Sequence, residues 1–154
     1  MAIQIVRLGT ARARDEGLRL GAVRLLPRGV TQQDYARLNY FDVWLPEVAP
    51  SRALVAYAQA KPWTDERWTV FARRYLREMR RPEARRLIGL LAALSRQASF
   101  SIGCYCESSA RCHRSLLGQL LDEEAGRLPA GSRKVKPKAR TRKAAAGAAK
   151  GRTR

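Results

Sequence analysis

The residues best suited to chemistry are concentrated in one short stretch of the sequence. Cys104, Cys106 and Cys112 are all the cysteines of the chain, and His113 is its only histidine. They surround a polar loop that follows an apolar run and precedes a helical pattern. In parallel α/β sheets, ligands bind where a strand ends and the next helix begins. We therefore predict a reactive or ligand-binding site at residues 104–113.

The helix that is expected to start near Cys112 adds an electrostatic argument. The N–H groups of a helix N-terminus favour anions, and Arg111 and Arg114 add full positive charges beside them. The same field is expected to lower the pKa of Cys112. We interpret the segment as an anion pocket that includes Ser115, with Cys112 and His113 as the candidate catalytic residues.

Other chemistries remain open for this cluster. A metal ion could take Cys104, Cys106, Cys112 and His113 as ligands, although their spacing differs from common zinc motifs. Cys106 and Cys112 could also form a redox pair across the loop. The spacing from either Cys104 or Cys106 to Arg111 does not match a phosphatase loop. In the simplest interpretation, the small sulfur side chains fill a strand and His113 caps a helix. No cofactor is predicted.

The elements around the cluster indicate the fold class. Short apolar runs predict strands at 3–8, 18–26, 41–45 and 100–106. Helical spacing and capping residues predict helices at 50–60, 65–81, 82–96 and 112–125. Strand, short loop and helix in this order are half of a βαβ unit. We predict a single α/β domain over residues 1–128, Rossmann-like and three-layered, with a mostly parallel sheet.

The helix at 65–81 has two different faces. Trp68, Phe71, Tyr75 and Met79 recur at the spacing of a buried apolar stripe. Most of its arginines lie elsewhere on the helix. We expect the aromatic stripe to be part of the core and the arginines to be solvated.

The positive charge is strongest at the C-terminal end. The chain has 154 residues and a net charge of +18, and residues 132–154 contain ten Lys or Arg but no Asp or Glu. With so little apolar surface to bury, residues 129–154 are expected to be disordered. Such a tail binds DNA or RNA without sequence preference and with strong salt dependence. The predicted contacts are Arg133, Lys134, Lys136, Lys138, Arg140, Arg142 and Lys143. The alternative is a solubilising tail without a dedicated partner.

The sequence also indicates the cellular compartment of the protein. No apolar run approaches the roughly 18 residues of a membrane helix, and the N-terminus lacks the pattern of a secretory signal. An odd number of crowded cysteines is typical of a reducing environment rather than of a disulfide framework. We expect a cytoplasmic protein with no membrane partner, and the oligomeric state stays open.

Three segments of the chain resemble one family. Residues 104–117, CYCESSARCHRSLL, are similar to the closing motif of the domain-of-unknown-function 488 (DUF488) family. Residues 23–29, VRLLPRG, and 44–51, WLPEVAPS, resemble its YeaO-like branch, although Val23 and Leu26 depart from that pattern. The resemblance implies a small Rossmann-like domain without a known activity. It also implies that the motif arginines Arg24, Arg28 and Arg114 share an anion site.

Two functional hypotheses follow. In the first, the Cys/His/Arg site binds a small anionic ligand without turnover, while the tail associates with nucleic acid. In the second, a Cys or His group acts on a small phosphorylated or nucleotide-like substrate. Both predict that Arg28 and Arg114 converge on Cys106, Cys112 and His113.

Overall fold

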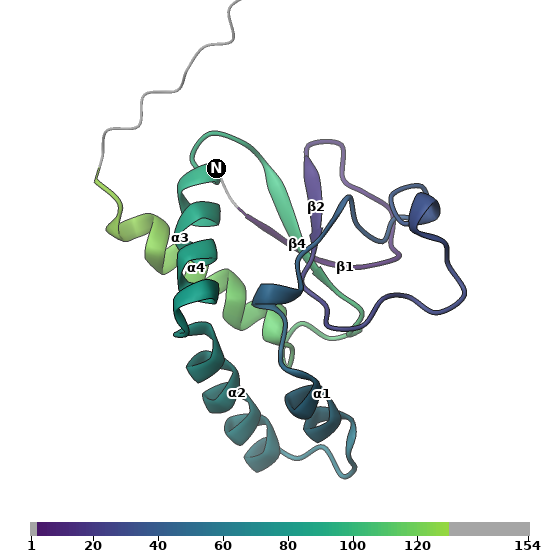
Figure 1. The fold of residues 1–154 in the computed structure, drawn as a ribbon, viewed down its shortest axis with the longest axis vertical. Coiled ribbons are helices and arrows are strands. Elements are labelled where there is room, and N and C mark those ends of the chain that lie inside the picture. Colours follow the sequence, from purple (N-terminus) through teal and green to yellow (C-terminus); the bar gives the residue numbers. More distant parts are fainter. Residues whose placement is uncertain (1–2, 130–154) are drawn as a thin grey trace, which may run out of the picture.

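A computed structural model describes residues 3–129 of the chain, and its centre is a parallel sheet (Figure 1). The strands are β1 (Gln4–Arg7), β2 (Leu18–Gly21), β3 (Val43–Trp44) and β4 (Phe100–Cys104). Their order is β1-β4-β2-β3, and all three pairings are parallel. The predicted α/β class and the parallel sheet are therefore confirmed.

The second and third strands are shorter than the sequence predicts. The N–H of Ala22 still donates to the carbonyl of Gly103 in β4, and beyond Ala22 the segment is held by side-chain contacts. Trp44 Nε1 donates to the carbonyl of Val23, and Arg24 donates to the carbonyls of Ala49 and Pro50. These contacts hold the segment after β2 as an irregular loop, although its apolar residues resemble those of a strand.

Four helices accompany the sheet: α1 (Arg52–Gln59), α2 (Asp65–Met79), α3 (Pro82–Leu94) and α4 (His113–Arg127). Two of them begin at capped N-termini close to the predicted helix starts. The hydroxyl of Ser51 accepts from the N–H of Leu54, and that of Thr64 accepts from the N–H of Arg67. None of the helices within residues 3–129 has the length and apolar character to span a membrane.

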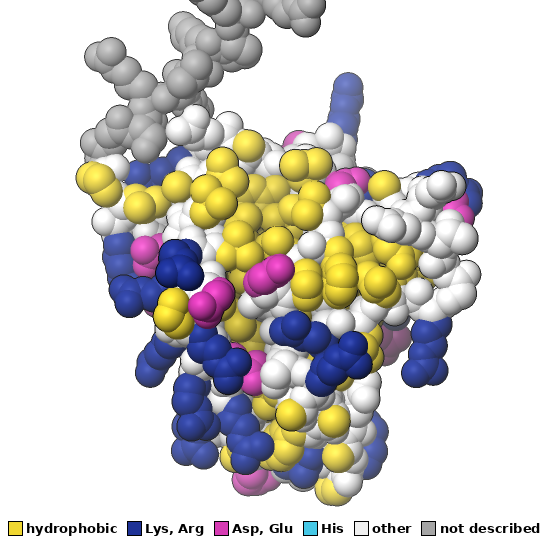
Figure 2. Space-filling model, viewed as in Figure 1, with side chains coloured by type: hydrophobic (Ala, Val, Ile, Leu, Met, Phe, Trp, Pro, Cys, Tyr) yellow, Lys and Arg dark blue, Asp and Glu magenta, His cyan; other side chains and the backbone are white. Residues whose placement is uncertain are grey.

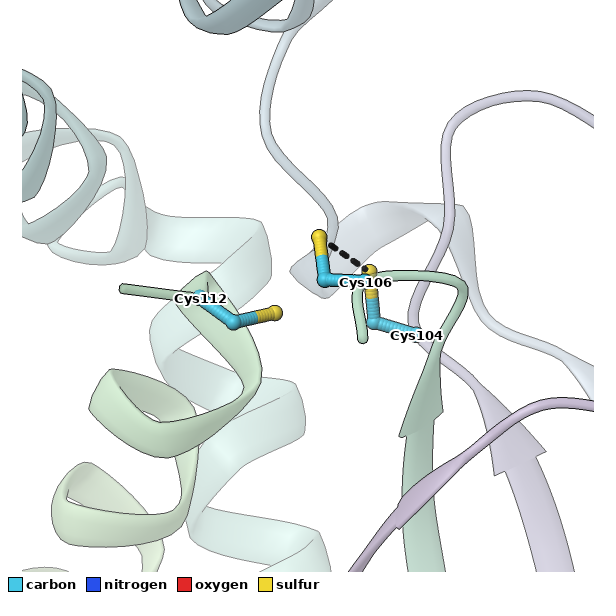
Figure 3. A group of neighbouring side chains, drawn as sticks. All are labelled: Cys104, Cys106 and Cys112. Atoms are coloured by element: carbon cyan, nitrogen blue, oxygen red, sulfur yellow. Dashed lines mark hydrogen bonds between the residues drawn. The ribbon is translucent and has the colours of Figure 1, made fainter. Parts of the chain in front are cut away.

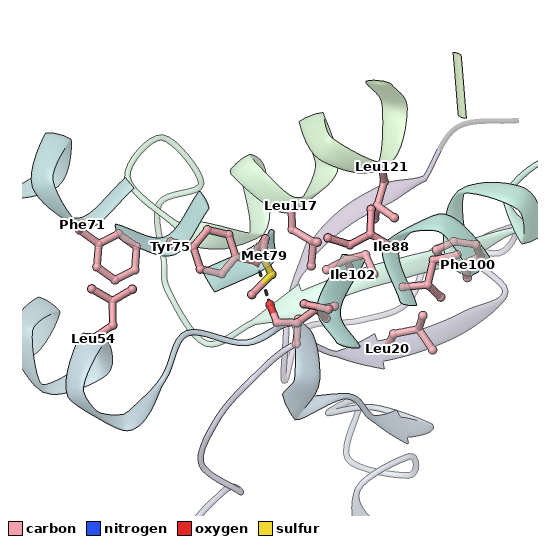
Figure 4. Close-up of a cluster of buried hydrophobic side chains, with 14 residues drawn as sticks. Leu20, Leu54, Phe71, Tyr75, Met79, Ile88, Phe100, Ile102, Leu117 and Leu121 are labelled. Atoms are coloured by element: carbon pink, nitrogen blue, oxygen red, sulfur yellow. Dashed lines mark hydrogen bonds between the residues drawn. The ribbon is translucent and has the colours of Figure 1, made fainter. Parts of the chain in front are cut away.

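The helices cover one face of the sheet (Figure 4). Leu20, Phe100 and Ile102 project from the strands into a cluster with residues of all four helices. The cluster comprises Leu20, Ala22, Val48, Leu54, Phe71, Tyr75, Met79, Ala84, Ile88, Leu91, Phe100, Ile102, Leu117 and Leu121. The aromatic stripe of α2 is thus part of the core, as predicted for Phe71 and Tyr75.

The opposite face is covered by loops. Gly21 and Gly103 point to this side, where a Cβ atom would lie 2.5 Å from Phe41 Cδ1 and 2.1 Å from Leu8 Cδ2 respectively. Only glycine permits this close approach of the loops to the strands. The third of the predicted layers is therefore irregular chain in the described residues, instead of the helices of a doubly wound fold.

A buried ion pair ties this loop layer to the sheet. Arg19 of β2 is fully buried, and its Nε lies 2.5 Å from Glu16 Oε1. Arg19 Nη2 also donates to Glu16 Oε2, and the other guanidinium hydrogens reach the carbonyls of Thr10, Ala11 and Asn39. Ser101 of β4 donates to Glu16 over 2.6 Å. Because both charges are paired and hydrogen-bonded, their burial is tolerated.

Candidate functional site

The three cysteines meet at the carboxyl end of β4 (Figure 3). Cys104 is the last residue of the strand, Cys106 lies in the loop, and Cys112 is the N-cap of α4. Their sulfur atoms all lie within 4.8 Å of one another, and the Cys104 and Cys106 sulfurs are 3.6 Å apart. The strand-loop-helix junction predicted from the sequence therefore brings these thiols together.

The thiols line a pocket of about 300 Å³. Cys106 is exposed, whereas Cys104 and Cys112 are buried. Most of the walls are apolar or aromatic and come from the loop after β2 and from the α1–α2 hairpin: Val23, Leu25, Pro50, Val55, Ala58, Trp63 and Phe71. A ligand in this pocket would reach Cys106 from an apolar chamber.

Contacts within the cluster separate the three thiols chemically. The hydrogen bond from Cys104 stabilises the charged form of Cys106 and, with the positive charge of Arg114 nearby, lowers the pKa of Cys106 well below its ordinary value. The interaction of Cys104 with Cys106 raises the pKa of Cys104 to about 11, and burial of Cys104 adds to this effect. The thiolate therefore lies on the exposed cysteine.

Cys112 behaves differently from the sequence-based expectation. Its interactions with Cys104 and Cys106, together with burial, raise its pKa. The predicted lowering by the helix N-terminus is wrong for this residue. The reason is that Cys112 lies inside the cluster, where it stays protonated and donates to a neighbour.

His113 is fixed and neutral. Its Nε2 lies 2.7 Å from the carbonyl oxygen of Ala22, which can only accept, so Nε2 carries the hydrogen. Nδ1 then keeps a lone pair and lies 3.9 Å from Cys112 Sγ. Burial lowers the pKa of His113, and its ring packs edge-on against Tyr75. His113 can thus accept a hydrogen bond from Cys112 but carries no charge near pH 7.

The predicted anion-site arginines do not all reach the pocket. Arg24 and Arg111 line it. Arg111 pairs with Asp65 at the start of α2, and Arg24 holds the carbonyls of Ala49 and Pro50. Arg28 is exposed and is not among the lining residues. The expected convergence of Arg28 with Arg114 on the cysteines is therefore not observed.

Arg114 does not line the pocket and instead stabilises the backbone around it. It is buried, and its guanidinium donates to the carbonyls of Val6, Cys104 and Glu107. These contacts join β1, the end of β4 and the cysteine loop. Ser115 also serves the backbone, since its hydroxyl donates to the carbonyl of Ser109. The geometry assigns both residues to positioning the loop.

Sequence reasoning missed the far wall of the pocket. Trp63 and Phe71 follow the same apolar pattern as core residues, and only the packing of α1 against α2 distinguishes the two roles. The tail residues predicted to contact nucleic acid, from Arg133 onward, lie outside the described residues.

A soft metal ion also fits the sulfur cluster. Zinc–sulfur bonds of about 2.3 Å in a tetrahedron place sulfurs roughly 3.8 Å apart, close to the 3.6 Å between Cys104 and Cys106. Metal-binding histidines commonly donate their other ring N–H to a carbonyl, as His113 does to Ala22. However, Nδ1 of His113 does not belong to the group of ligand atoms that lie within 4.8 Å of one another, which consists of the three sulfurs. The donor set for a metal is therefore three thiolates.

Comparison with known proteins identifies the family. The family model DUF488-N3a, described as the active DUF488-N3 subclade, matches residues 3–125. Searches of curated proteins and of solved structures gave no match. The YeaO-like branch stays a prediction, because the match is to the N3 subclade. With most of its length matched, the chain belongs to the DUF488 family.

Proposed function

We propose that the pocket is a thiol-dependent active site in which Cys106 is the nucleophile. The observation that supports this most strongly is the placement of one exposed thiol against two buried ones at the mouth of a pocket. A thiolate is the reactive form of cysteine, and neighbouring donors increase its population at neutral pH. Cys104 supplies such a donor, with its sulfur 3.6 Å from that of Cys106.

The pocket walls define the class of substrate. Apolar and aromatic side chains surround most of the chamber, and Arg24 and Arg111 contribute the positive charge. This combination suits a small compound with a flat or apolar body and an anionic group, of which a nucleotide-like molecule is one example. The same groups would hold such a ligand if no turnover occurred.

Site-resolved alkylation tests the assignment of the nucleophile. The full chain is treated with iodoacetamide at pH 7, and labelled peptides are quantified over time by mass spectrometry. Cys106 should be labelled first, whereas Cys104 and Cys112 should react only after unfolding. Labelling of Cys112 or Cys104 at the rate of Cys106 would contradict the proposal.

A zinc-type site is the second candidate, favoured by the mutual distances of the three sulfurs. In this case the metal stabilises all three thiolates, and all three cysteines are protected from alkylation together. Metal analysis of the purified protein should then find one zinc per chain, and a strong chelator should accelerate the alkylation of every cysteine. A thiol nucleophile without metal predicts chelator-independent labelling of Cys106 alone.

We also propose that the basic C-terminal segment associates with nucleic acid. Residues 132–154 contain ten Lys or Arg and no Asp or Glu. Such side chains replace the counterions around a polyanion, and the release of these counterions favours binding. We place the end of the folded domain near residue 128. The free thiols of Cys104, Cys106 and Cys112 favour a reducing compartment, for which we propose the cytoplasm.

A further inference from the structure

The arginines of α2 and α3 form a separate basic surface (Figure 2). Seven exposed arginines lie between residues 73 and 86, with only Glu78 and Glu83 as acids in this stretch. Lys and Arg side chains gather over α2 and the adjacent end of α3 in this view. We call this surface the arginine face; it consists of Arg73, Arg74, Arg77, Arg80, Arg81, Arg85 and Arg86.

Most of these guanidinium groups have no partner in the fold. Arg74 lies over the ring of Tyr57, and Arg86 approaches Glu83 at 3.8 Å. The other five make no hydrogen bond or ion pair with any residue in 3–129. By contrast, Arg96 donates to three carbonyls. A set of unpaired like charges is self-repelling, so an external anion stabilises it.

The spacing of the arginine face suits a chain of anions. Arg73 and Arg77 are four residues apart in α2, which corresponds to a rise of about 6 Å, and Arg80 and Arg81 follow directly after the helix ends at Met79. Two surface hollows flank the end of α2. One is lined by Arg74, Arg77 and Arg81 together with Glu78, and the other by Arg80, Arg85 and Arg86 together with Glu124. Three guanidinium groups against one carboxylate leave each hollow with an excess of positive charge.

We propose that the arginine face binds the phosphate backbone of nucleic acid. Guanidinium groups bind phosphate oxygens with two parallel hydrogen bonds, and a series of such contacts fits a repeating phosphate chain. A membrane surface fits less well, because no large apolar side chain is exposed among residues 73–86. Contacts of this kind do not depend on base sequence. The proposal is independent of the thiol pocket and of the basic C-terminal segment.

The test compares two variants of the full chain that lose the same charge. The first is Arg77→Gln/Arg80→Gln/Arg81→Gln, at the centre of the arginine face. The second is Arg14→Gln/Arg28→Gln/Arg37→Gln, in which all three exposed arginines lie outside residues 73–86 and outside the hollows that the arginine face lines. Binding to a fluorescent duplex DNA of mixed sequence is measured by anisotropy across a range of salt concentrations.

The salt dependence distinguishes a specific face from general charge. Each lost phosphate contact should reduce the slope of log Kobs against log salt by about 0.9. The arginine-face variant should therefore bind at least ten-fold more weakly at low salt and show the reduced slope, and the control should retain both values. Equal losses in the two variants would overturn the proposal, as would tighter binding of the native chain to phosphatidylserine vesicles than to the duplex.

Discussion

The sulfurs of Cys104 and Cys106 lie 3.6 Å apart, one at the buried end of β4 and the other at the open mouth of the pocket. Because adjacent thiols cannot ionise independently, the buried member stays protonated and stabilises the charge on the exposed one. The chemistry of the site therefore depends on residues that a ligand does not need to touch.

Replacement of Cys104 tests this dependence. Cys104→Ala removes the main hydrogen-bond donor to Cys106, so the pKa of Cys106 should rise toward the ordinary value of about 8.5. Alkylation of Cys106 at pH 6 should slow at least ten-fold. Ser108→Ala in the same exposed loop is the control and should leave the rate unchanged. Equal rates for all three proteins would exclude the donor role of Cys104.

Arg114 and Arg111 are three residues apart but should differ in their effect on stability. Arg114→Gln leaves the buried carbonyl of Cys104 and the part-buried carbonyls of Val6 and Glu107 without their charged donor, at a cost of about 3 kcal/mol. Arg111→Gln loses a pair that is exposed, worth under about 1 kcal/mol. Urea unfolding followed by circular dichroism measures both. Similar losses would show that Arg114 is not a structural clamp.

The buried pair of Glu16 and Arg19 predicts a pH dependence of stability. The hydrogen bond from Arg19 lowers the pKa of Glu16 from 4.5 to about 2, so its carboxylate stabilises the fold fully above pH 4.5. This contribution, about 3 kcal/mol, should be lost as the pH falls from 4.5 to 2. In Glu16→Gln the unfolding free energy should lose this slope.

Asp34, in an exposed pair with Arg37, is the matched control for Glu16. Asp34→Asn should leave the pH profile of unfolding close to that of the native chain. If Glu16→Gln and Asp34→Asn give the same profile, the buried pair does not determine the acid sensitivity.

The basic C-terminal segment should contribute a separate share of nucleic-acid binding. Truncation after Gly131 removes ten cations, and the affinity for a mixed-sequence duplex should fall at least ten-fold at low salt. The remaining binding should be lost on further replacement of Arg77, Arg80 and Arg81. Unchanged binding after truncation would assign the association to the folded domain alone.

The fold was largely predictable from local patterns. Ser51, Thr64 and Pro82 lie at the starts of three helices at the predicted places, and the apolar run predicted as a strand at 100–106 forms β4 over Phe100–Cys104. The length of β2 was not predictable. Apolar residues after Gly21 resemble a strand, whereas the side-chain contacts that end it come from distant residues.

The site was predictable in its location but not in its roles. All three cysteines and His113 lie close together in sequence, so their proximity is a local property. The identity of the thiolate depends on burial, which separates Cys106 from Cys112 only after folding. Trp63 and Phe71 become pocket walls through the packing of α1 and α2, which periodicity cannot reveal.

The pH dependence of Cys106 alkylation reports whether this cysteine is a thiolate in the folded chain. Rates for the folded full chain are measured from pH 4 to pH 8 with the labelled peptide resolved by mass spectrometry. A thiolate stabilised by Cys104 predicts an apparent pKa well below 8.5, so that the rate reaches a plateau below pH 8. A rate that rises about ten-fold per pH unit, as for a thiol with a pKa of about 8.5, would contradict the account.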